Sequence, residues 1–305
     1  MSEGKLNRRP NFFILGAPKC GTTSLVYWLR EHPNVFISPW KEPRFFDRDL
    51  STRFRISEAE YLALFKNATS EHTTIGESTV WYLYSEQAAK NIEQACPGSK
   101  YVVLVRNPAR MAYALHEQMT LHQAEHVLDF EKAWELSPVR RKGEGVRKWF
   151  ISEPRLLDYQ SVCRVGEQLN RLFMTVPRER VLVLFLDDFK TDSRKEYLKV
   201  IDFLGLSDDG RKEFGIRNSA KRVRWRQFQQ LLVLAMKGER VLKGRLGMAP
   251  RNSNMFWRLN DLNKSSRPRP LLSIGLRKHL RDYYEDDIAM LGQLTARDLN
   301  KWLVV

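Results

Sequence analysis

A short apolar run that ends in a glycine-rich turn constrains the fold of this chain more than any other feature of its sequence. Residues 11–15 are mostly apolar, residues 16–23 read Gly-Ala-Pro-Lys-Cys-Gly-Thr-Thr, and residues 22–31 have apolar side chains at helical spacing. This order predicts a strand, a turn and a helix. Residues 101–105 and 181–186 predict two more strands, each followed by helix-compatible sequence. Such alternation favours an α/β fold, with a P-loop-type parallel sheet flanked by helices on both faces.

Apolar periodicity predicts further helices along most of the remaining chain. The expected helices are 84–96, 108–123, 155–176, 194–204, 225–242 and 273–302, the last broken near Thr295. At 305 residues the chain is long enough for one large domain, and we expect a single domain over 1–305. Within it, residues 1–10 are expected to form a flexible basic N-terminus. Residues 243–270 contain glycine, proline, serine and basic residues, which favours a long surface excursion.

The composition narrows the choice of compartment and partner. The net charge of +15 indicates an affinity for anions, whether a nucleotide, an acidic polysaccharide, an anionic lipid surface or nucleic acid. Three scattered cysteines are too few for a disulfide framework or a thiolate zinc site. No apolar run approaches the ~18 residues that span a bilayer, and residues 1–10 lack the apolar region of a secretory signal. We therefore expect a cytoplasmic protein with no transmembrane segment. Peripheral contact with a membrane surface is an alternative that stays open.

The glycine-rich turn has the two glycines of a phosphate-binding loop, but its lysine has an unusual position. An ordinary nucleotide triphosphatase has lysine directly after the second glycine, where this chain has Thr22. Here Lys19 lies inside the loop instead. Backbone N–H groups and the start of the following helix still suit an anion. The loop is therefore predicted to bind phosphate, with its one full positive charge acting on a different group.

An arginine follows the second predicted strand. After residues 101–105 a metal-dependent phosphoryl-transfer enzyme would normally have an aspartate that holds magnesium, whereas this chain has Arg106. An arginine repels a metal ion and attracts a phosphate. We therefore expect a donor nucleotide with a second phosphate, and a reaction that needs no metal.

In this combination the loop and Arg106 resemble the PAPS-dependent sulfotransferases, in particular the heparan-sulfate-type and bacterial carbohydrate-sulfotransferase-like branch. PAPS is 3′-phosphoadenosine 5′-phosphosulfate, the sulfuryl donor of that family. The resemblance implies that Arg106 binds the 3′-phosphate. Where the family usually has a serine, this chain has Ala114, so one hydroxyl contact to that phosphate is absent. The loop residues implied to bind the 5′-phosphosulfate are Lys19, Cys20, Gly21, Thr22, Thr23 and Ser24.

The segment 40–47 is similar to the family segment in which a glutamate lies near the acceptor. By that match Glu42 is the base that takes the acceptor proton. Without the resemblance, an exposed glutamate paired with Lys41 or Arg44 is the simpler interpretation. His116 is the second candidate for the base, because it follows Arg106 by about three helical turns and some cytosolic sulfotransferases use a histidine.

Two more segments match the family. Ser78 lies where the family often has a lysine, which implies that more of the transition-state charge rests on Lys19. Residues 218–224 resemble the late basic loop that closes over the nucleotide, and this implies contacts from Lys221 and Arg222. A lid of this kind excludes the water that would hydrolyse the donor.

The resemblance implies an in-line attack by the acceptor on sulfur, with 3′,5′-bisphosphoadenosine (PAP) as the second product. The expected acceptor is a hydroxyl, or an amine, of a carbohydrate, a glycolipid or a small molecule. Two alternatives stay open: a divergent P-loop nucleotide kinase or triphosphatase, and a non-enzymatic protein that binds polyanions through the basic stretch 217–245. Nucleic acid is not the expected partner, because no nucleic-acid-binding fold signature accompanies that stretch.

Overall fold

The structure of the chain is a computed structural model. It describes residues 9–53, 55–215, 221–223, 228, 231–236, 238–239, 259, 262–266 and 271–304, of which 221–223 and 264–266 are described by their backbone alone. Several sequence predictions therefore lie largely outside the described residues. These are the flexible N-terminus 1–10, the lid 218–224 and the surface excursion 243–270. Of the helix predicted over 225–242, the structure describes residues 228, 231–236 and 238–239, which are helical.

Contacts between Cα atoms divide the chain into two compact units. The first unit comprises Met1–Ala112, Gln160–Arg217 and Ile274–Val305, and the second comprises Tyr113–Tyr159 and Asn218–Ser273. The single domain expected from the sequence stays a prediction. In the described part of the chain, no helix is long and apolar enough to cross a bilayer.

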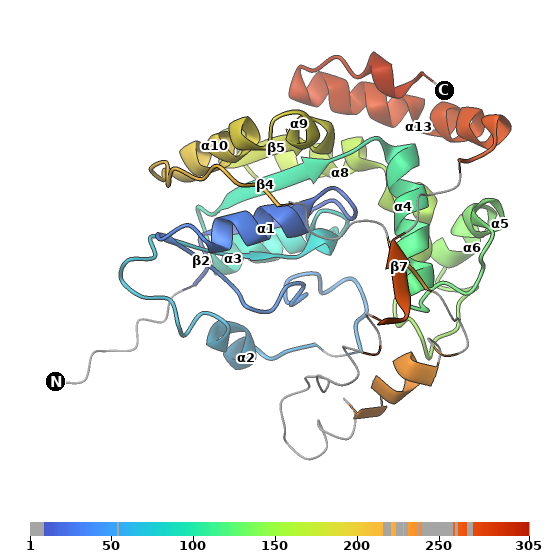
Figure 1. The fold of residues 1–305 in the computed structure, drawn as a ribbon, viewed down its shortest axis with the longest axis horizontal. Coiled ribbons are helices and arrows are strands. Elements are labelled where there is room, and N and C mark those ends of the chain that lie inside the picture. Colours follow the sequence, from blue (N-terminus) through green and yellow to red (C-terminus); the bar gives the residue numbers. More distant parts are fainter. Residues whose placement is uncertain are drawn as a thin grey trace. The chain divides into compact units, whose positions relative to one another are not determined.

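Five parallel strands form the sheet of the first unit (Figure 1). Their order is β2-β3-β1-β4-β5, and every neighbouring pair is parallel. The strands are β1 Phe12–Gly16, β2 Val35–Ile37, β3 Thr74–Ser78, β4 Lys100–Val105 and β5 Val181–Phe185. All residues of β1 and β3 are buried, as expected for strands covered on both faces. The predicted α/β class with a parallel sheet flanked by helices is confirmed.

The sequence predicted β1, β4 and β5 but neither β2 nor β3. Strand β2 has three residues, too few for a periodic signal. Strand β3 contains a glycine and a glutamate, which are uncommon in strands. Gly76 is needed there because a Cβ atom would lie 2.3 Å from the Phe12 ring of β1. Strand β3 therefore depends on its neighbour in the sheet rather than on its own composition.

The helices of the first unit agree with most of the predicted ranges. They are α1 Thr22–Arg30, α2 Glu58–Ala63, α3 Ala88–Ala95, the start of α4 Pro108–Leu121, α8 Val165–Phe173, α9 Leu186–Thr191, α10 Ser193–Leu204 and α13 Ile274–Thr295, with the short turns η1 Val80–Tyr82, η3 Arg178–Arg180 and η4 Asn300–Trp302. The second unit contains the rest of α4, α5 Phe130–Glu135, α6 Ser137–Arg141, η2 Pro154–Leu157 and the antiparallel pair β6 Lys221–Val223 and β7 Lys264–Ser266. The predicted break near Thr295 is confirmed.

The single helix predicted over 155–176 is wrong. That range divides into η2, α7 Tyr159–Val162 and α8. Helix α8 starts anew because the buried carboxylate of Asp287, on α13, accepts the backbone N–H groups of Gly166 and Glu167 at 3.0 and 2.9 Å. An N-terminus capped by a side chain from a distant helix leaves no periodic signal in the local sequence.

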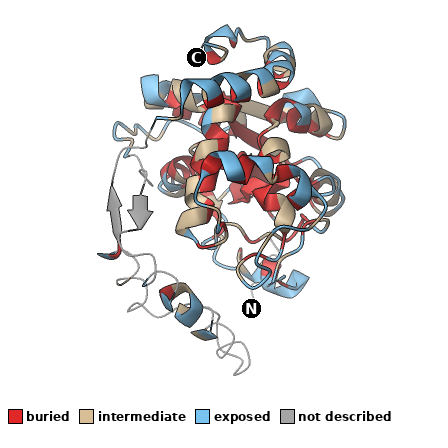
Figure 2. Cartoon of the chain, turned by 90° about the vertical axis from the view of Figure 1, so that its right-hand side faces the viewer, coloured by how far each residue is buried: buried red, intermediate tan, exposed pale blue. Residues whose placement is uncertain are grey.

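The core of the first unit lies on the sheet and on the helix faces turned toward it, where Figure 2 shows the buried residues in red.

The strand order of the sheet also indicates where a ligand would bind. From β1 the chain passes through α1 to β2 on one side of the sheet, whereas β4 and β5 extend the sheet on the other side (Figure 1). Ligands of open α/β sheets bind at the carboxyl ends of the strands where the direction of winding changes in this way. Here that point lies between β1 and β4.

Candidate active site

The loop between β1 and α1 depends on two glycines with positive φ. Gly16 has φ 134°, and a Cβ atom on it would lie 2.6 Å from the carbonyl oxygen of Val80. Gly21 has φ 94° and occupies the N-cap position of α1 without a side-chain hydrogen bond to the helix. The first N–H groups of a helix have no acceptor within the helix, and a start that no side chain caps suits a bound anion. The loop thus has the backbone that a phosphate group requires.

Lys19 and Arg106 lie together at the carboxyl ends of β1 and β4. The Nη1 of Arg106 donates to the Lys19 carbonyl oxygen at 3.3 Å, and both side chains are half-buried. Cys20, between the two glycines, is fully buried, and its Sγ lies 3.4 Å from the Pro18 carbonyl oxygen. Burial raises the pKa of the Cys20 thiol to about 12, although Arg106 and Lys19 both act to lower it. The thiol therefore stays protonated. The positive charge at this site comes from Lys19 in the loop and from Arg106 beside it.

The other residues predicted to bind the nucleotide differ in how far they are buried and in the element to which they belong. On α1, Thr22 and Ser24 are buried and Thr23 is half-buried. Ala114 is buried on α4. The backbone of Lys221 and Arg222 belongs to β6, but their side chains lie outside what the structure describes. Their predicted roles in binding stay predictions.

Glu42 makes three hydrogen bonds, and two of them hold it against the end of β3 and the start of η1. Its backbone N–H donates to the Ser78 carbonyl oxygen at 2.9 Å, and its Oε2 accepts the Val80 N–H at 2.9 Å. Its Oε1 accepts Lys41 Nζ at 2.6 Å, which is the pairing that the simpler interpretation of the sequence expected. The carboxylate is 28% exposed and keeps lone pairs for a further partner. Val80 also lies against Gly16, so the structure brings Glu42 and the phosphate loop together.

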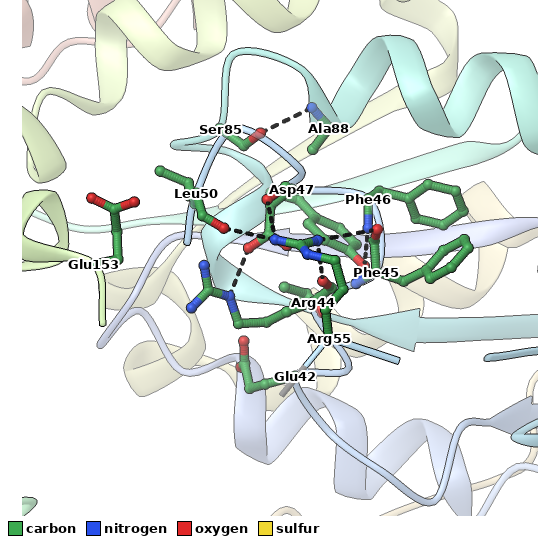
Figure 3. A network of polar contacts seen from close by, with 12 residues as sticks. Glu42, Arg44, Phe45, Phe46, Asp47, Leu50, Arg55, Ser85, Ala88 and Glu153 are labelled. Atoms are coloured by element: carbon green, nitrogen blue, oxygen red, sulfur yellow. Dashed lines mark hydrogen bonds and ion pairs between the residues drawn. The ribbon is translucent and has the colours of Figure 1, made fainter. Parts of the chain in front are cut away.

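The segment after Glu42 is fixed by a polar network (Figure 3). Asp47 is fully buried and accepts Arg44 Nε at 2.7 Å. The guanidinium of Arg55 donates to the carbonyl oxygens of Arg44, Asp47 and Leu50 at 3.1, 3.1 and 2.7 Å. Arg55 has no role predicted from the sequence, because no local pattern links it to a segment that ends eight residues earlier. These contacts hold an irregular segment in which Glu42 and Arg44 both have positive φ.

Ser78 ends β3 beside Glu42. Its side chain is 1% exposed, and among the described residues its Oγ has no hydrogen-bond partner. A buried hydroxyl of this kind can donate a neutral hydrogen bond to a bound ligand. The predicted role of Lys19 in carrying the transition-state charge stays a prediction.

Glu77, which is fully buried in β3, was not among the residues predicted from the sequence. The hydroxyls of Tyr61 and Tyr82 both donate to its Oε1 at 2.9 Å, and Thr79 Oγ1 donates to its Oε2 at 3.1 Å. Burial raises the pKa of Glu77 to about 8, and the three hydroxyl donors only partly oppose this. The one signal in the sequence was an acidic residue in a stretch that otherwise fits a buried strand.

We expect Glu77 to make the stability of the folded protein fall as pH rises. Its folded pKa of about 8 lies above the ordinary value of 4.5, so the folded state holds a proton that the unfolded state has released. Stability from this group is therefore complete below pH 4.5 and is lost as pH rises through 8, by about 1 kcal/mol per pH unit. Urea unfolding of the wild type and Glu77→Gln should diverge in this way between pH 6.5 and 8. Parallel curves over that interval would contradict the raised pKa.

His116, the second candidate for the base, is 3% exposed in the second unit. Its Nε2 lies 2.8 Å from the Val127 carbonyl oxygen, and its ring packs on Phe130 with the centroids 5.4 Å apart. Burial lowers the pKa of His116, so the ring is neutral near pH 7. Nearby, Glu125 pairs with Arg140 at 2.8 Å and both are buried. These contacts explain the burial of His116 by its packing beside a polar cluster. Its role as a base stays a prediction.

The described ranges contain no group of side chains suited to a metal ion. Within them, no three His, Cys, Asp or Glu side chains lie together so that they could hold one.

A family comparison matches the same residues. The profile of the sulfotransferase domain matches residues 9–224, which include the loop, Glu42, Ser78 and Arg106. This chain belongs to the sulfotransferase domain family. The family predicted from the sequence is confirmed.

Curated relatives of this sulfotransferase-family chain indicate its branch. It is 25% identical over 213 residues to the human bifunctional heparan sulfate N-deacetylase/N-sulfotransferase 3, covering 67% of this chain and 23% of the relative. It is 28% identical over 207 residues to human heparan sulfate glucosamine 3-O-sulfotransferase 6, covering 68% of this chain and 55% of the relative. The chain thus spans between about a quarter and about half of the length of these relatives. These relatives support the predicted carbohydrate-sulfotransferase-like branch.

A solved structure supports the fold of this sulfotransferase-family chain. The crystal structure of a sulfotransferase from Alicyclobacillus acidocaldarius superposes with a TM-score of 0.69 at 24% sequence identity. The match covers 97% of this chain and 99% of that protein.

Proposed function

We propose that this chain transfers a sulfuryl group from PAPS to a hydroxyl or amine of a carbohydrate, a glycolipid or a small molecule. The observation on which this rests is the arrangement of three groups in one unit. Arg106 donates to the Lys19 carbonyl oxygen, and Val80 contacts both Glu42 and Gly16. A loop for the 5′-phosphosulfate, a cation for the 3′-phosphate and a carboxylate for the acceptor therefore lie at one edge of the sheet.

In the proposed reaction the acceptor oxygen or nitrogen attacks sulfur in line with the bridging oxygen of the donor. A new bond to sulfur forms, and the bond between sulfur and the bridging oxygen breaks. Its electron pair passes to the phosphate of PAP, where Lys19 stabilises the negative charge. Glu42 takes the proton that the acceptor loses. No step in this scheme requires a metal ion, because Lys19 supplies at the leaving phosphate the positive charge that magnesium supplies to phosphoryl-transfer enzymes.

An anionic carbohydrate is the acceptor class that we favour. The named relatives act on heparan sulfate, and the net charge of +15 suits an acidic polysaccharide. We propose to follow PAP release from PAPS, with desulfated heparan sulfate as the acceptor and a panel of neutral sugars and small alcohols as comparison. Turnover with compounds of this panel and none with desulfated heparan sulfate would indicate a small-molecule acceptor instead. The cytoplasmic location stays a prediction, which fractionation of the native cells would test.

The nucleotide site can be tested without an acceptor. Arg106→Ala should weaken PAP binding by about 10- to 100-fold, because a charge-assisted hydrogen bond contributes roughly 1.5–3 kcal/mol. Binding of adenosine 5′-phosphate, which has no 3′-phosphate, should hardly change. Isothermal titration calorimetry without metal measures both constants.

Adenosine 5′-phosphate is the internal control for the integrity of the loop, and Arg110→Ala, on an exposed arginine one turn later, is the matched control variant. Equal losses for both nucleotides would assign Arg106 a structural role alone. Tighter binding of ATP with magnesium than of PAP would favour the kinase or triphosphatase alternative instead. Salt-sensitive polyanion binding that persists in a variant lacking both Lys19 and Arg106 would favour the non-enzymatic alternative.

A further inference from the structure

Two buried tyrosines donate to the same carboxylate oxygen but differ in one respect. Tyr61 and Tyr82 are 1% and 2% exposed, and each hydroxyl lies 2.9 Å from Glu77 Oε1. The Tyr82 hydroxyl also accepts the backbone N–H groups of Phe45 and Phe46, at 2.9 and 3.2 Å. Tyr61 instead stacks its ring on Phe45, with the centroids 4.3 Å apart. Only Tyr82 therefore links Glu77 to the backbone of the segment that follows Glu42.

The Oε1 atom of Glu77 sets the direction in which the Tyr82 proton points, and this decides from which side the hydroxyl can accept. A phenol has one proton to donate and two lone pairs. Because the proton of Tyr82 points to Glu77, both lone pairs are available for Phe45 and Phe46. A hydroxyl without that acceptor could turn its proton toward one of the two N–H groups and lose the contact.

The same short element holds the segment at a second point. Tyr82 ends η1 and Val80 begins it, and the Val80 N–H donates to Glu42 Oε2. Between Glu42 and Phe46 the backbone is irregular, with positive φ at Glu42 and Arg44. Contacts at both ends of this stretch therefore determine where the Glu42 carboxylate points.

We propose that Tyr82, oriented by Glu77, is a positioning residue that fixes the Glu42 carboxylate for proton transfer. The proposal rests on the function proposed above, in which Glu42 is the base. Tyr82 itself touches no reacting atom in this scheme, and it acts through the N–H groups of Phe45 and Phe46 and through η1.

Tyr82→Phe and Tyr61→Phe form a matched pair, because each removes one hydroxyl from the same Glu77 oxygen and keeps its ring. Misplacement of a catalytic group by about 1 Å can cost on the order of 100-fold in rate. We expect Tyr82→Phe to lower kcat for PAP release by about 10- to 100-fold, with PAP affinity and the KM for PAPS nearly unchanged. Tyr61→Phe should lose a similar amount of thermal stability but keep kcat within about threefold of wild type.

Amide hydrogen exchange gives a readout that needs no acceptor. The N–H groups of Phe45 and Phe46 should be protected in the wild type and in Tyr61→Phe, and should exchange faster in Tyr82→Phe. Fast exchange of both amides in the wild type would overturn the proposal even if Tyr82→Phe does not fold. Equal loss of kcat in the two variants, or no loss in a folded Tyr82→Phe, would also overturn it. A wild type that releases no PAP with any acceptor would instead contradict the proposed function.

Discussion

Replacing Lys19 by methionine is expected to lower kcat for PAP release by about 100- to 1000-fold, the cost of removing one charged or hydrogen-bonding stabiliser of a transition state. Negative charge grows on the bridging oxygen as sulfur leaves, and Lys19 is the residue of the loop that can place a full positive charge there. Methionine keeps an unbranched side chain up to Cε but lacks the ammonium group, at a residue with φ 64°. Steady-state kinetics with desulfated heparan sulfate measure the effect.

PAP binding should survive in the Lys19→Met variant, because Arg106 and the uncapped start of α1 are unchanged. Lys66→Met is the matched control, since Lys66 is exposed and follows α2. A variant that binds PAP as the wild type does and retains full kcat would show that the leaving phosphate takes its charge stabilisation from another group. Arg106 would then be the next residue to test.

Replacing Glu42 by glutamine is expected to lower kcat by about 100- to 10,000-fold, the usual contribution of a general base. The amide keeps an oxygen that can accept the Val80 N–H, so the segment should stay in place while the base is lost. PAP affinity should be nearly unchanged, because Glu42 is assigned to the acceptor. Kinetics and calorimetry on one preparation separate these two quantities.

Glu71→Gln, on an exposed glutamate, is the matched control for the change of charge. Unchanged turnover in Glu42→Gln would move the base elsewhere, and His116 would be the first alternative. Its neutral state near pH 7 is compatible with that role, but its Nε2 is occupied by the Val127 carbonyl oxygen. A base at His116 would therefore have to use Nδ1, for which the described residues offer no partner.

Local sequence is sufficient to single out Lys19 and Arg106 as candidates for the nucleotide site. Lys19 lies between two glycines that punctuate a strand and a helix, and Arg106 directly follows an apolar strand. Such features depend on residues close together in the chain, and strand ends of a parallel sheet meet at one edge whatever the rest of the fold does. Glu42 could be chosen only through the family resemblance, because its own sequence context equally suits an exposed ion pair with Lys41.

The sequence by itself determined the glycine-rich loop between a strand and a helix, the α/β class and the location of Arg106 beside that loop, since periodicity and turn residues act locally. Only the tertiary structure decided that β3 is a buried strand, that Arg55 holds the segment after Glu42, and that Glu77 joins Tyr61 to Tyr82. These groups meet across 8, 16 and 5 residues of chain, in turns and strands with no shared period. Burial of a carboxylate among hydroxyls depends on which elements pack together, and the packing of distant elements leaves no signal in any short stretch of sequence.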